Sequence, residues 1–455
     1  MSECRSLAGK TFSITVLGCR VNHYEAEAIA SMLESSGAVF APLCARSANP
    51  DIIVAVTCSI TSAADATTRK ALRRARRENP QSLLVACGCW AQAATEEEAI
   101  SLGVDILIGN RVKGLIPEMI ERWHESPGKF ACKKIDVAKS PEWDRMSLDR
   151  PRMLTRAFIK VQDGCDRGCS YCAVPSLRGA HVSRSPDDVA EEISSVASHG
   201  TREIILTGIQ LGSYEYCGTT LAGLIRRASR IEGVRRLRLG SLEPFSLTEE
   251  LLRAAAESEA FCRHLHLPVQ SGDDGVLASM RRGYSSSDFA RIVGMARDCL
   301  GDETHISTDL IVGFPGEGEE AFSNSMRLLE DLSVGKVHVF PFSPRRGTEA
   351  ASMGAEVPRR VVKERVERAL RLSGELAAAY ASKWIGKTDS ILVENADSGT
   401  ASGWSRHYVK VYAAAQDTGN CLKGNELQVN PKISIGSILL CEGVDVGKVT
   451  VCDDE

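Results

Sequence analysis

The sequence predicts an α/β protein made of three parts: an N-terminal domain with a parallel sheet, a partial (β/α)6 barrel, and a small C-terminal all-β barrel. Three observations support this prediction. Short β-branched runs alternate with amphipathic stretches over residues 11–125, and six further strand and helix repeats follow up to residue 340. After Trp384 the sequence is rich in β-branched residues separated by Gly and Asn. A length of 455 residues also suits about three domains.

The N-terminal domain, predicted over residues 10–125, has the alternation of βαβ units, which form a parallel sheet. Its predicted strands are Phe12 to Leu17, Asp51 to Val56, Ser82 to Ala86 and Asp105 to Ile108. The predicted helices are 23–35, 63–78 and 93–102. Residues 126–152 are polar and contain three prolines, which indicates a linker.

The second domain is predicted over residues 153–383 as an open barrel of six βα repeats without turn-linked hairpins. Its predicted strands are 157–161, 203–207, 235–239, 263–267, 306–312 and 336–340. Stretches such as 187–198 and 318–332 have helical periodicity. Functional residues of such a barrel are expected at the carboxyl ends of the strands.

A helix rich in Arg and Ala, over about 358–384, leads into the last domain. Residues 384–455 contain three β-branched runs between Gly and Asn turns, which predicts a small all-β barrel. The runs are Ser390 to Val393, His407 to Tyr412 and Ile433 to Cys441.

Composition narrows the class of protein. Hydrophobic residues make up 43% and charged residues 25%, values of a globular protein rather than a disordered one. The net charge of −4 leaves nucleic-acid contacts to local patches. No apolar run reaches the roughly 18 residues of a membrane span. Val16 to Cys19 resembles a lipoprotein cleavage box, but the apolar run before it is at the short limit for a signal core. We expect a cytoplasmic protein without membrane contact.

The 16 cysteines favour metal or redox chemistry in a reducing compartment over a disulfide scaffold. The strongest signal is Cys165-x3-Cys169-x2-Cys172, just after the first barrel strand. Three thiolates at this spacing can hold three irons of a cubane cluster and leave the fourth open to a ligand. A zinc site completed by His181 and a set of inert thiols are the alternatives.

A second set of cysteines is dispersed. Cys19, Cys58 and one of Cys87 or Cys89 follow the first three predicted strands. The carboxyl ends of neighbouring parallel strands lie side by side, so these thiols should converge. Spacing alone does not choose between Cys87 and Cys89, and each cysteine taken singly is more often a small buried hydrophobe. That interpretation is assigned to the remaining cysteines: Cys4, Cys44, Cys132, Cys217, Cys262, Cys299, Cys421, Cys441 and Cys452.

The Cys-x3-Cys-x2-Cys motif, with Tyr171 before its last cysteine, resembles the radical S-adenosylmethionine (SAM) superfamily. Downstream residues Pro175, Arg178-Gly179 and Ser183-Arg184 are similar to the methylthiotransferases of that superfamily. The segments around Cys19, Cys58 and Cys89 also resemble that family, and Gly88 to Gln92 selects Cys89 as the third ligand. Val56 departs from the family, which often has Asn there.

This resemblance implies two 4Fe-4S clusters. The cluster on Cys165, Cys169 and Cys172 would bind and cleave SAM to give a 5′-deoxyadenosyl radical that abstracts hydrogen from an inert C–H bond. The cluster on Cys19, Cys58 and Cys89 would hold the sulfur that is transferred. An electron donor such as flavodoxin or ferredoxin is implied as a partner.

Contacts to SAM are expected at the ends of the later barrel strands, although Gly, Pro and Ser at such places also serve turns. The candidates are Thr207, Gly208, Ser241, Glu243, Gln270 and Asp309.

A tRNA partner is predicted from a cationic stripe on the helix after the second strand, where Arg73, Arg74 and Arg77 are candidate phosphate contacts among six cations. A second basic helix carries Arg359, Arg360, Lys363, Arg365, Arg368 and Arg371. The C-terminal domain resembles the RNA-binding TRAM domain, and Arg406 and Lys410 are its candidate contacts. It departs from a basic module, because residues 386–455 hold 6 Lys and Arg against 10 Asp and Glu.

Gly18 to Asn22 and His264 to Gly272 look most like methylthiotransferases that modify threonylcarbamoyladenosine in tRNA. Relatives acting on isopentenyladenosine usually differ at residues 20 and 21, and relatives acting on a ribosomal-protein aspartate usually have His at position 271. Both remain alternatives, as does a zinc-bearing RNA-binding protein without catalysis. Arg178 and Arg184 are candidates for binding the threonylcarbamoyl carboxylate, or else structural ion-pair partners.

Overall fold

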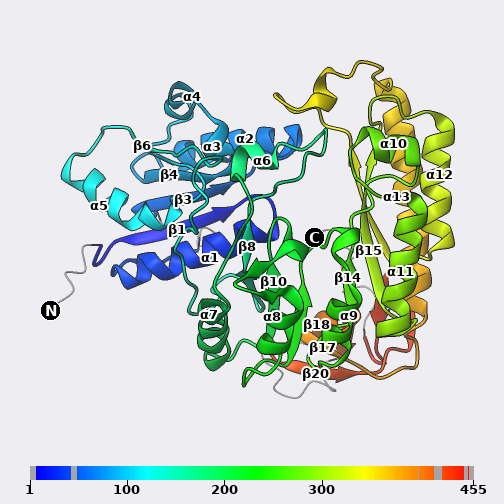
Figure 1. The fold of residues 1–455 in the computed structure, drawn as a ribbon. Helices are drawn as coiled ribbons and strands as arrows, with labels where there is room; N and C mark the ends of the chain where they lie inside the picture. Colours follow the sequence, from blue (N-terminus) through cyan, green and yellow to red (C-terminus); the bar gives the residue numbers. More distant parts are fainter. Residues whose placement is uncertain (1–6, 43–48, 398, 415–422, 445–448, 450–455) are drawn as a thin grey trace.

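The computed structural model describes residues 7–42, 49–397, 399–414, 423–444 and 449. It confirms the α/β class and the order of the three parts: a parallel sheet with helices, an open barrel, and a strand-rich C-terminal sheet (Figure 1). No helix in these ranges combines the length and the hydropathy needed to span a bilayer.

In the described residues, the N-terminal sheet has the order β2-β1-β3-β4-β5-β6, and all its pairs are parallel. The central strands β3 and β4 are buried at every position, as a sheet covered on both faces requires. The strands are β1 (Thr11–Val16), β2 (Val39–Phe40), β3 (Ile52–Thr57), β4 (Leu83–Gly88), β5 (Ile106–Ile108) and β6 (Ala131–Lys133). The helices are α1 (Arg20–Ser35), α2 (Ser62–Glu78), α3 (Cys89–Ala93), α4 (Glu96–Ser101) and α5 (Ile116–Glu125), with a 3-10 turn at Lys113–Leu115.

The helix predicted over 93–102 is shorter in the structure: it is α4, Glu96–Ser101, and Ala93 is the last residue of the preceding helix α3. Ala94 ends α3 in an extended conformation, and the hydroxyl of Thr95 accepts a hydrogen bond from the Glu98 amide, which starts α4. A polar side chain able to cap a helix thus interrupts a continuous apolar period.

The predicted linker over 126–152 is ordered and packed. Strand β6 pairs with β5 inside this segment, because the edge of β5 offers unpaired backbone groups. Further on, the Asp144 carboxylate accepts hydrogen bonds from the backbone amides of Lys113 and Gly114, at 2.9 and 3.0 Å. Leu148 is buried in the main core. The segment therefore connects the two domains while it packs against both.

The six predicted barrel strands are all present. They form two three-stranded parallel sheets, joined by the bridges Leu237↔Phe261 and Ser241↔His266 into the order β7-β10-β13-β14-β15-β16. The strands are β7 (Ala157–Lys160), β10 (Glu203–Thr207), β13 (Arg236–Leu239), β14 (His264–His266), β15 (His305–Val312) and β16 (Lys336–Pro341). The helices are α6 (Val174–Arg178), α7 (Pro186–Ser198), α8 (Leu221–Ala228), α9 (Glu249–Ala256), α10 (Asp274–Ser279), α11 (Ser286–Leu300), α12 (Glu319–Asp331) and α13 (Arg359–Ser382). The 3-10 turns are Leu211–Ser213, Pro244–Ser246 and Glu349–Ser352.

The barrel does contain a turn-linked hairpin, contrary to the prediction. Strands β11 (Glu215–Tyr216) and β12 (Thr219–Thr220) pair across Cys217 and Gly218, which have φ angles of 47° and 85°. A two-residue hairpin turn with both φ values positive suits the twist of the strands, but Cys rarely occupies such a position. A second antiparallel pair, β8 (Gln162–Asp163) with β9 (Val182–Ser183), flanks the Cys165 loop.

The C-terminal sheet has the order β20-β17-β18-β19-β22-β21 within the part of the chain that the structure describes. Its strands are β17 (Asp389–Asp397), β18 (Thr400–Ser405), β19 (Lys410–Ala414), β20 (Glu426–Val429), β21 (Ile433–Ile435) and β22 (Ile438–Leu440). The strand predicted from His407 begins only at Lys410, because Tyr408 adopts a φ of 61° in the preceding turn. Trp384, after α13, packs into the core of this sheet.

Glu203 fastens the C-terminal sheet to the barrel. Its buried carboxylate pairs with Arg236 at 2.5 Å and with Arg238 at 2.9 Å. The same two guanidinium groups donate to backbone oxygens of the C-terminal domain, Arg236 to Trp404 at 2.9 Å and Arg238 to Ser405 at 2.6 Å. Burial opposes ionisation of Glu203, but the three nearby arginines hold its pKa well below the usual value. One carboxylate thus holds two cations that bind the next domain.

We predict that Glu203→Gln lowers the free energy of unfolding by about 3 to 5 kcal/mol, because Arg236 and Arg238 stay buried without their counter-charge. Denaturant unfolding measures this decrease. Glu249→Gln is the control, because its ion pair with Arg253 is exposed and should contribute no more than about 1 kcal/mol. Equal effects of the two substitutions would contradict the assigned role of Glu203.

Candidate functional site

Cys165, Cys169 and Cys172 lie on the loop between β8 and α6, at the carboxyl end of the first barrel strand. Gly164 has a φ of 73°, and a Cβ there would lie 2.0 Å from the Ala180 oxygen, so the loop requires glycine. The loop closes on itself through hydrogen bonds from the Cys165 amide to Gly179 and from the Cys172 amide to Cys169, at 3.0 and 3.1 Å. The backbone therefore gathers the three thiols on one short loop.

Arg282, which sequence reasoning missed, supports this loop. It is 4% exposed, and its guanidinium donates to the Cys169 sulfur at 3.4 Å and pairs with Glu243 at 2.5 Å. Glu243, predicted to contact SAM, is thus held beside the cysteine loop. Burial, and then the charges of Cys169 and Cys165, raise the pKa of Cys172 to about 12. The positive charge of Arg282 acts in the opposite direction and favours the thiolate form. The sequence gives no sign of this role, because Arg282 follows α10 and lies 113 residues after Cys169 along the chain.

The structure brings Cys19, Cys58 and Cys89 together. They follow β1, β3 and β4, which are neighbours in the sheet. A Cβ on Gly18 would lie 2.9 Å from the Cys58 sulfur, which shows how closely the first two loops approach. Burial, together with the charges of Cys89 and Cys19, raises the pKa of Cys58 to about 11.

Local contacts fix the two later loops of this set. Thr68 of α2 donates to the Cys58 carbonyl at 2.8 Å, so the packed face of α2 anchors the Cys58 loop. Gly88 has a φ of 99°, and a Cβ there would lie 2.6 Å from the Thr57 oxygen. The amide of Asn110 donates to the Cys89 sulfur at 3.7 Å and to the Leu177 carbonyl of the barrel at 2.8 Å.

Cys87 is placed differently from Cys89. It lies within β4, is fully buried and belongs to the main hydrophobic core. Burial raises its pKa to about 12, and its charged neighbours are Lys113, Glu25 and Asp144. Of the cysteines interpreted as buried hydrophobes, Cys4, Cys44, Cys421 and Cys452 lie outside the described residues, and Cys262 is buried. Cys132, Cys299 and Cys441 are half-buried, and Cys217 is exposed because it occupies the β11–β12 turn, so that interpretation is wrong for Cys217.

The donor chemistry of both triads fits a cubane cluster. Within the described ranges, no three or more His, Cys, Asp and Glu side chains are arranged to hold a single metal ion. A cubane is larger than one ion, and its ligating sulfurs stand further apart, while its irons prefer thiolates. His181, the zinc alternative's fourth ligand, instead contacts the Ser183 hydroxyl through Nε2 at 3.2 Å.

The predicted SAM contacts fall into two groups. Ser241, Gln270 and Asp309 lie close together. Ser241 forms a parallel β-bridge with His266, whose Nε2 lies 3.2 Å from the Asp309 carboxylate. The backbone amide of Gln270 donates to the Asp309 carbonyl at 2.9 Å. Thr207 is buried, and Gly208 packs against Gln162. Gln270 has a φ of 71°, which marks strained backbone at the end of β14.

Aromatic and imidazole rings fill the interior between β14, β15 and the C-terminal domain. His264 stacks on Tyr408 with a ring separation of 4.2 Å, and His305 stacks on Tyr380 at 4.4 Å. Arg20, the residue after Cys19, donates to the Tyr408 hydroxyl at 3.3 Å. Burial, and then the charges of His266 and Arg20, lower the pKa of His338 to about 4. Arg20 therefore reaches from the N-terminal domain to the barrel interior.

The cationic stripe on α2 is smaller than the sequence predicts. Arg69 pairs with Asp65 and Glu98, and Arg76 donates to the Gly103 carbonyl at 2.9 Å, so both act inside the N-terminal domain. The predicted contacts Arg73, Arg74 and Arg77 are exposed, although Arg74 and Arg77 both pair with Glu78. Helical periodicity predicts which face a side chain lies on, but it does not predict the acidic partners that tertiary packing brings to that face.

Arg406 and Lys410 make contacts within the chain. The Arg406 guanidinium donates to the carbonyls of Arg235 and Glu259, and Lys410 pairs with Glu394 at 3.1 Å. On the second basic helix, Arg365 is buried against Glu317. Arg406 thus holds the C-terminal domain against the barrel, whereas Lys410 forms an ion pair inside that domain.

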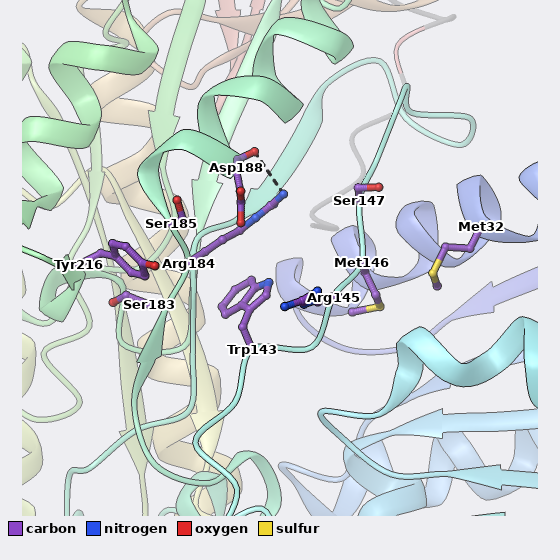
Figure 2. Close-up of a pocket in the computed structure, with 10 residues that line it drawn as sticks. All are labelled: Met32, Trp143, Arg145, Met146, Ser147, Ser183, Arg184, Ser185, Asp188 and Tyr216. Atoms are coloured by element: carbon purple, nitrogen blue, oxygen red, sulfur yellow. Dashed lines mark hydrogen bonds between the residues drawn. The ribbon is translucent and has the colours of Figure 1, made fainter.

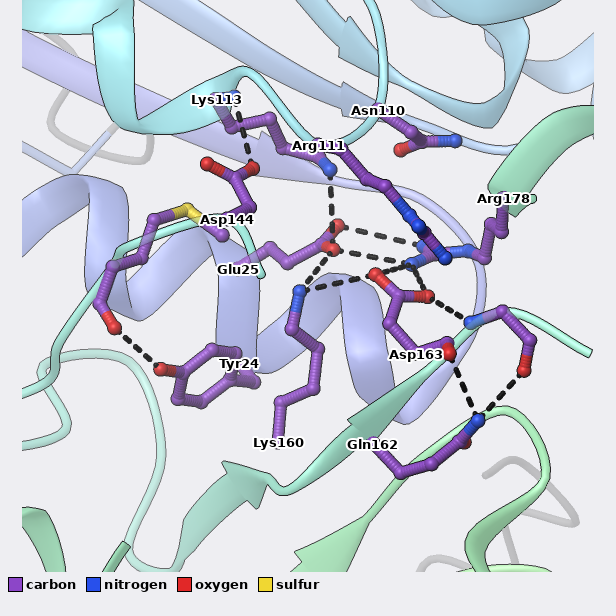
Figure 3. Close-up of polar contacts among 12 residues, drawn as sticks. Tyr24, Glu25, Asn110, Arg111, Lys113, Asp144, Lys160, Gln162, Asp163 and Arg178 are labelled. Carbon is purple, nitrogen blue, oxygen red and sulfur yellow. Dashed lines mark hydrogen bonds and ion pairs between the residues drawn. The ribbon is translucent and has the colours of Figure 1, made fainter. Parts of the chain in front are cut away.

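Arg178 and Arg184 are both structural ion-pair partners. Arg178 is 1% exposed and pairs with Glu25 and Asp163 (Figure 3). Arg184 is 6% exposed and pairs with Glu192. Of the two roles expected for Arg178 and Arg184, these contacts support the structural one.

A pocket of about 570 Å³ lies beside Arg184, between the segment before the barrel, β9 and the start of α7 (Figure 2). Its lining combines aromatic rings, hydroxyls and cations: Met32, Trp143, Arg145, Met146, Ser147, Ser183, Arg184, Ser185, Asp188 and Tyr216. None of these ten residues is one of the six predicted cluster ligands, so the pocket is distinct from both cysteine sites.

Comparison with known proteins agrees with this architecture. The model of the radical SAM superfamily matches residues 159–329, and that of the uncharacterized protein family UPF0004 matches residues 11–109. The radical SAM methyltransferase TsrM of Kitasatospora setae has a similar fold, with a TM-score of 0.57 at 14% identity over 76% of this chain and 77% of that one.

Relatives by sequence cover most of the chain. The threonylcarbamoyladenosine tRNA methylthiotransferase MtaB of Bacillus subtilis is 33% identical over 88% of this chain and 90% of its own length. MtaB of Thermotoga maritima is 34% identical over 88% and 91%. The tRNA-2-methylthio-N(6)-dimethylallyladenosine synthase of Thermobifida fusca is 33% identical over 84% and 78%. Together with the two cysteine sites and the open barrel, these relatives show that the chain belongs to the radical SAM methylthiotransferases.

Proposed function

We propose that this enzyme inserts a methylthio group at C2 of the adenine in N6-threonylcarbamoyladenosine, beside the anticodon of tRNA. Relatives that carry out radical SAM methylthiolation of tRNA cover most of the chain, and they support the reaction class. Their names divide between two adenine substrates, so the choice of substrate rests on the residues of this chain.

Membership of the family implies a 4Fe-4S cluster and SAM, and Cys165, Cys169 and Cys172 are the residues that would hold this cluster. When bound, the cluster and SAM supply the carbon radical chemistry that an unactivated C–H bond requires. Arg282 keeps Cys169 and Glu243 in place. Ser241 and Gln270 follow β13 and β14, and Asp309 lies beside them within β15, on the side of the barrel where a bound SAM would be contacted.

A second 4Fe-4S cluster is assigned to Cys19, Cys58 and Cys89, as the holder of the sulfur. Their convergence at one sheet edge and their thiolate chemistry support it. Asn110 orients Cys89, and Thr68 orients the Cys58 loop. An external one-electron donor, such as flavodoxin or ferredoxin, is the further partner that this chemistry needs.

The single observation that carries the substrate assignment is the position of Arg20. It follows Cys19, and its side chain reaches Tyr408 at the barrel interior. Burial favours the neutral form of Asp309, but the charges of His266, His338 and Arg20 hold its pKa below the usual value, so Arg20 lies near Asp309 of β15. A cation next to Cys19, a ligand of the proposed sulfur-holding cluster, suits a modified adenine that carries a carboxylate. An isopentenyl group is apolar and would leave the charge of Arg20 without a partner.

We predict that Cys19→Ala, Cys58→Ala or Cys89→Ala removes about half of the bound iron and abolishes sulfur transfer, while SAM cleavage persists. Replacing Cys165, Cys169 and Cys172 by Ala should remove the other half and abolish cleavage. Iron, sulfide and 5′-deoxyadenosine assays under anaerobic conditions check both. Cys87→Ala is the matched control, and removal of one cluster by this substitution would contradict the choice of Cys89.

We predict that Arg20→Met lowers kcat/KM for tRNA carrying threonylcarbamoyladenosine by about 10- to 100-fold, chiefly through KM, since the variant cannot make one charge-assisted hydrogen bond. Binding of the same tRNA without the threonylcarbamoyl group should not change. Arg20→Lys, which keeps the positive charge, is the control and should lose less. Equal weakening for both tRNAs would contradict a contact to the carboxylate.

The substrate itself is tested in cells. A strain lacking this protein should contain threonylcarbamoyladenosine without its methylthio derivative, as measured by nucleoside mass spectrometry, and complementation should restore the derivative. Disappearance of methylthio-isopentenyladenosine, or of a methylthio-aspartate in a ribosomal protein, would instead overturn the substrate assignment.

We predict that Arg73, Arg74 and Arg77 changed together to Glu weaken tRNA binding and flatten its salt dependence, by about 0.7 to 0.9 in the log–log slope for each phosphate that these arginines neutralise. Filter binding at several salt concentrations measures the slope. Arg122, Arg253 and Arg291 changed together to Glu provide a control of equal charge and similar exposure. Equal slopes for both triple variants would assign the α2 arginines to a solvated face.

A further inference from the structure

Five charged side chains form a buried network between the N-terminal sheet and the barrel (Figure 3). Arg178 and Lys160 each pair with both Glu25 and Asp163, at 3.1 to 3.2 Å, and Lys113 pairs with Glu25 at 3.2 Å. None of the five is more than 2% exposed. Water therefore cannot screen these charges.

The network holds three cations against two carboxylates. The next charged neighbours shown in Figure 3, Asp144 and Arg111, are 7% and 6% exposed and offset each other. One positive charge is left over. Burying an unmatched charge costs several kcal/mol, so a negative group is expected in contact with this network.

The surplus charge faces the cysteines that follow the sheet strands. Arg178 donates through Nη2 to Asn22 at 2.8 Å, and the Cys19 sulfur lies 3.9 Å from the same Asn22 oxygen. Asn22 thus lies between Arg178 and Cys19, and Asn110 links the Cys89 sulfur to the carbonyl of Leu177, the residue before Arg178.

We propose that Arg178 is the counter-charge of the cluster held by Cys19, Cys58 and Cys89, and that it sets the reduction potential of that cluster. A cubane core with two positive charges, bound by three thiolates, carries one net negative charge and would neutralise the network. Arg178 acts through the cysteines and is a positioning residue. The proposal rests on the second cluster assigned above.

The same network reaches the other cysteine loop. Asp163 accepts a hydrogen bond from the Gly164 amide at 2.8 Å, directly before Cys165. Glu25 lies on α1, which begins directly after Cys19. Arg178 thus joins the two cysteine loops through one carboxylate on each side.

The test uses the full chain with Cys165, Cys169 and Cys172 replaced by Ala, which leaves only the proposed second cluster. Its one-electron midpoint potential is measured by anaerobic titration with dithionite, followed by electron paramagnetic resonance. Adding Arg178→Gln removes a positive charge, which disfavours the reduced cluster at least tenfold, or about 59 mV towards lower potential. Arg178→Lys should recover part of this shift.

Two further variants separate charge from structure. Glu25→Gln removes a negative charge from the same network and should raise the potential. Arg184→Gln removes an equally buried guanidinium that pairs with Glu192, and it should leave the potential unchanged. If Arg178→Gln fails to fold, the opposite shifts of Arg178→Lys and Glu25→Gln carry the test.

The outcomes distinguish this proposal from the one on which it rests. Absence of iron from the triple-alanine parent would overturn the second cluster itself. Iron in the parent, with no shift in either Arg178 variant or with the same shift in Arg184→Gln, would overturn the role of Arg178 alone.

Discussion

The buried ion network of Glu25, Asp163 and Arg178 is the interaction on which the arrangement of this enzyme depends. It spans the interface between the N-terminal sheet and the barrel, where each cysteine loop lies next to one of its carboxylates. Ion pairs removed from water require close geometry, because any displacement leaves a charge without a partner. The network therefore fixes how the two cysteine loops face each other, which apolar packing alone would leave free to slide.

Both cysteine sites follow from one property of parallel strands. The carboxyl ends of adjacent strands lie together, so residues distant in the chain meet there, as Cys19, Cys58 and Cys89 do. The barrel brings residues together in the same way, since Ser241 after β13 and Gln270 after β14 lie close to Asp309 of β15. Glycines at positions 18, 88 and 164 allow the loops to approach each other closely. Sheet topology thus brings the functional side chains together, and the glycines allow their loops to pack at the required distance.

Charge is used mainly for internal cohesion. Arg236 and Arg238 hold the C-terminal sheet through Glu203, and Arg406 strengthens the same interface by donating to barrel carbonyls. The C-terminal domain can therefore be acidic overall and still dock firmly on the barrel. Exposed cations remain on α2, where Arg73 and Arg77 lie, which moves the expected tRNA contact towards the N-terminal domain.

The sequence by itself determined the three-part α/β fold and all six barrel strands, because periodicity is a local property. It also predicted that Cys19, Cys58 and one of Cys87 or Cys89 converge, and the family resemblance selected Cys89. Only the tertiary structure decided which charges are paired. Arg282 beside Cys169, the burial of Arg178 and the packing of β6 depend on partners far away in the chain. A residue's type shows that it can form an ion pair, but the distance between two charges is set by the fold.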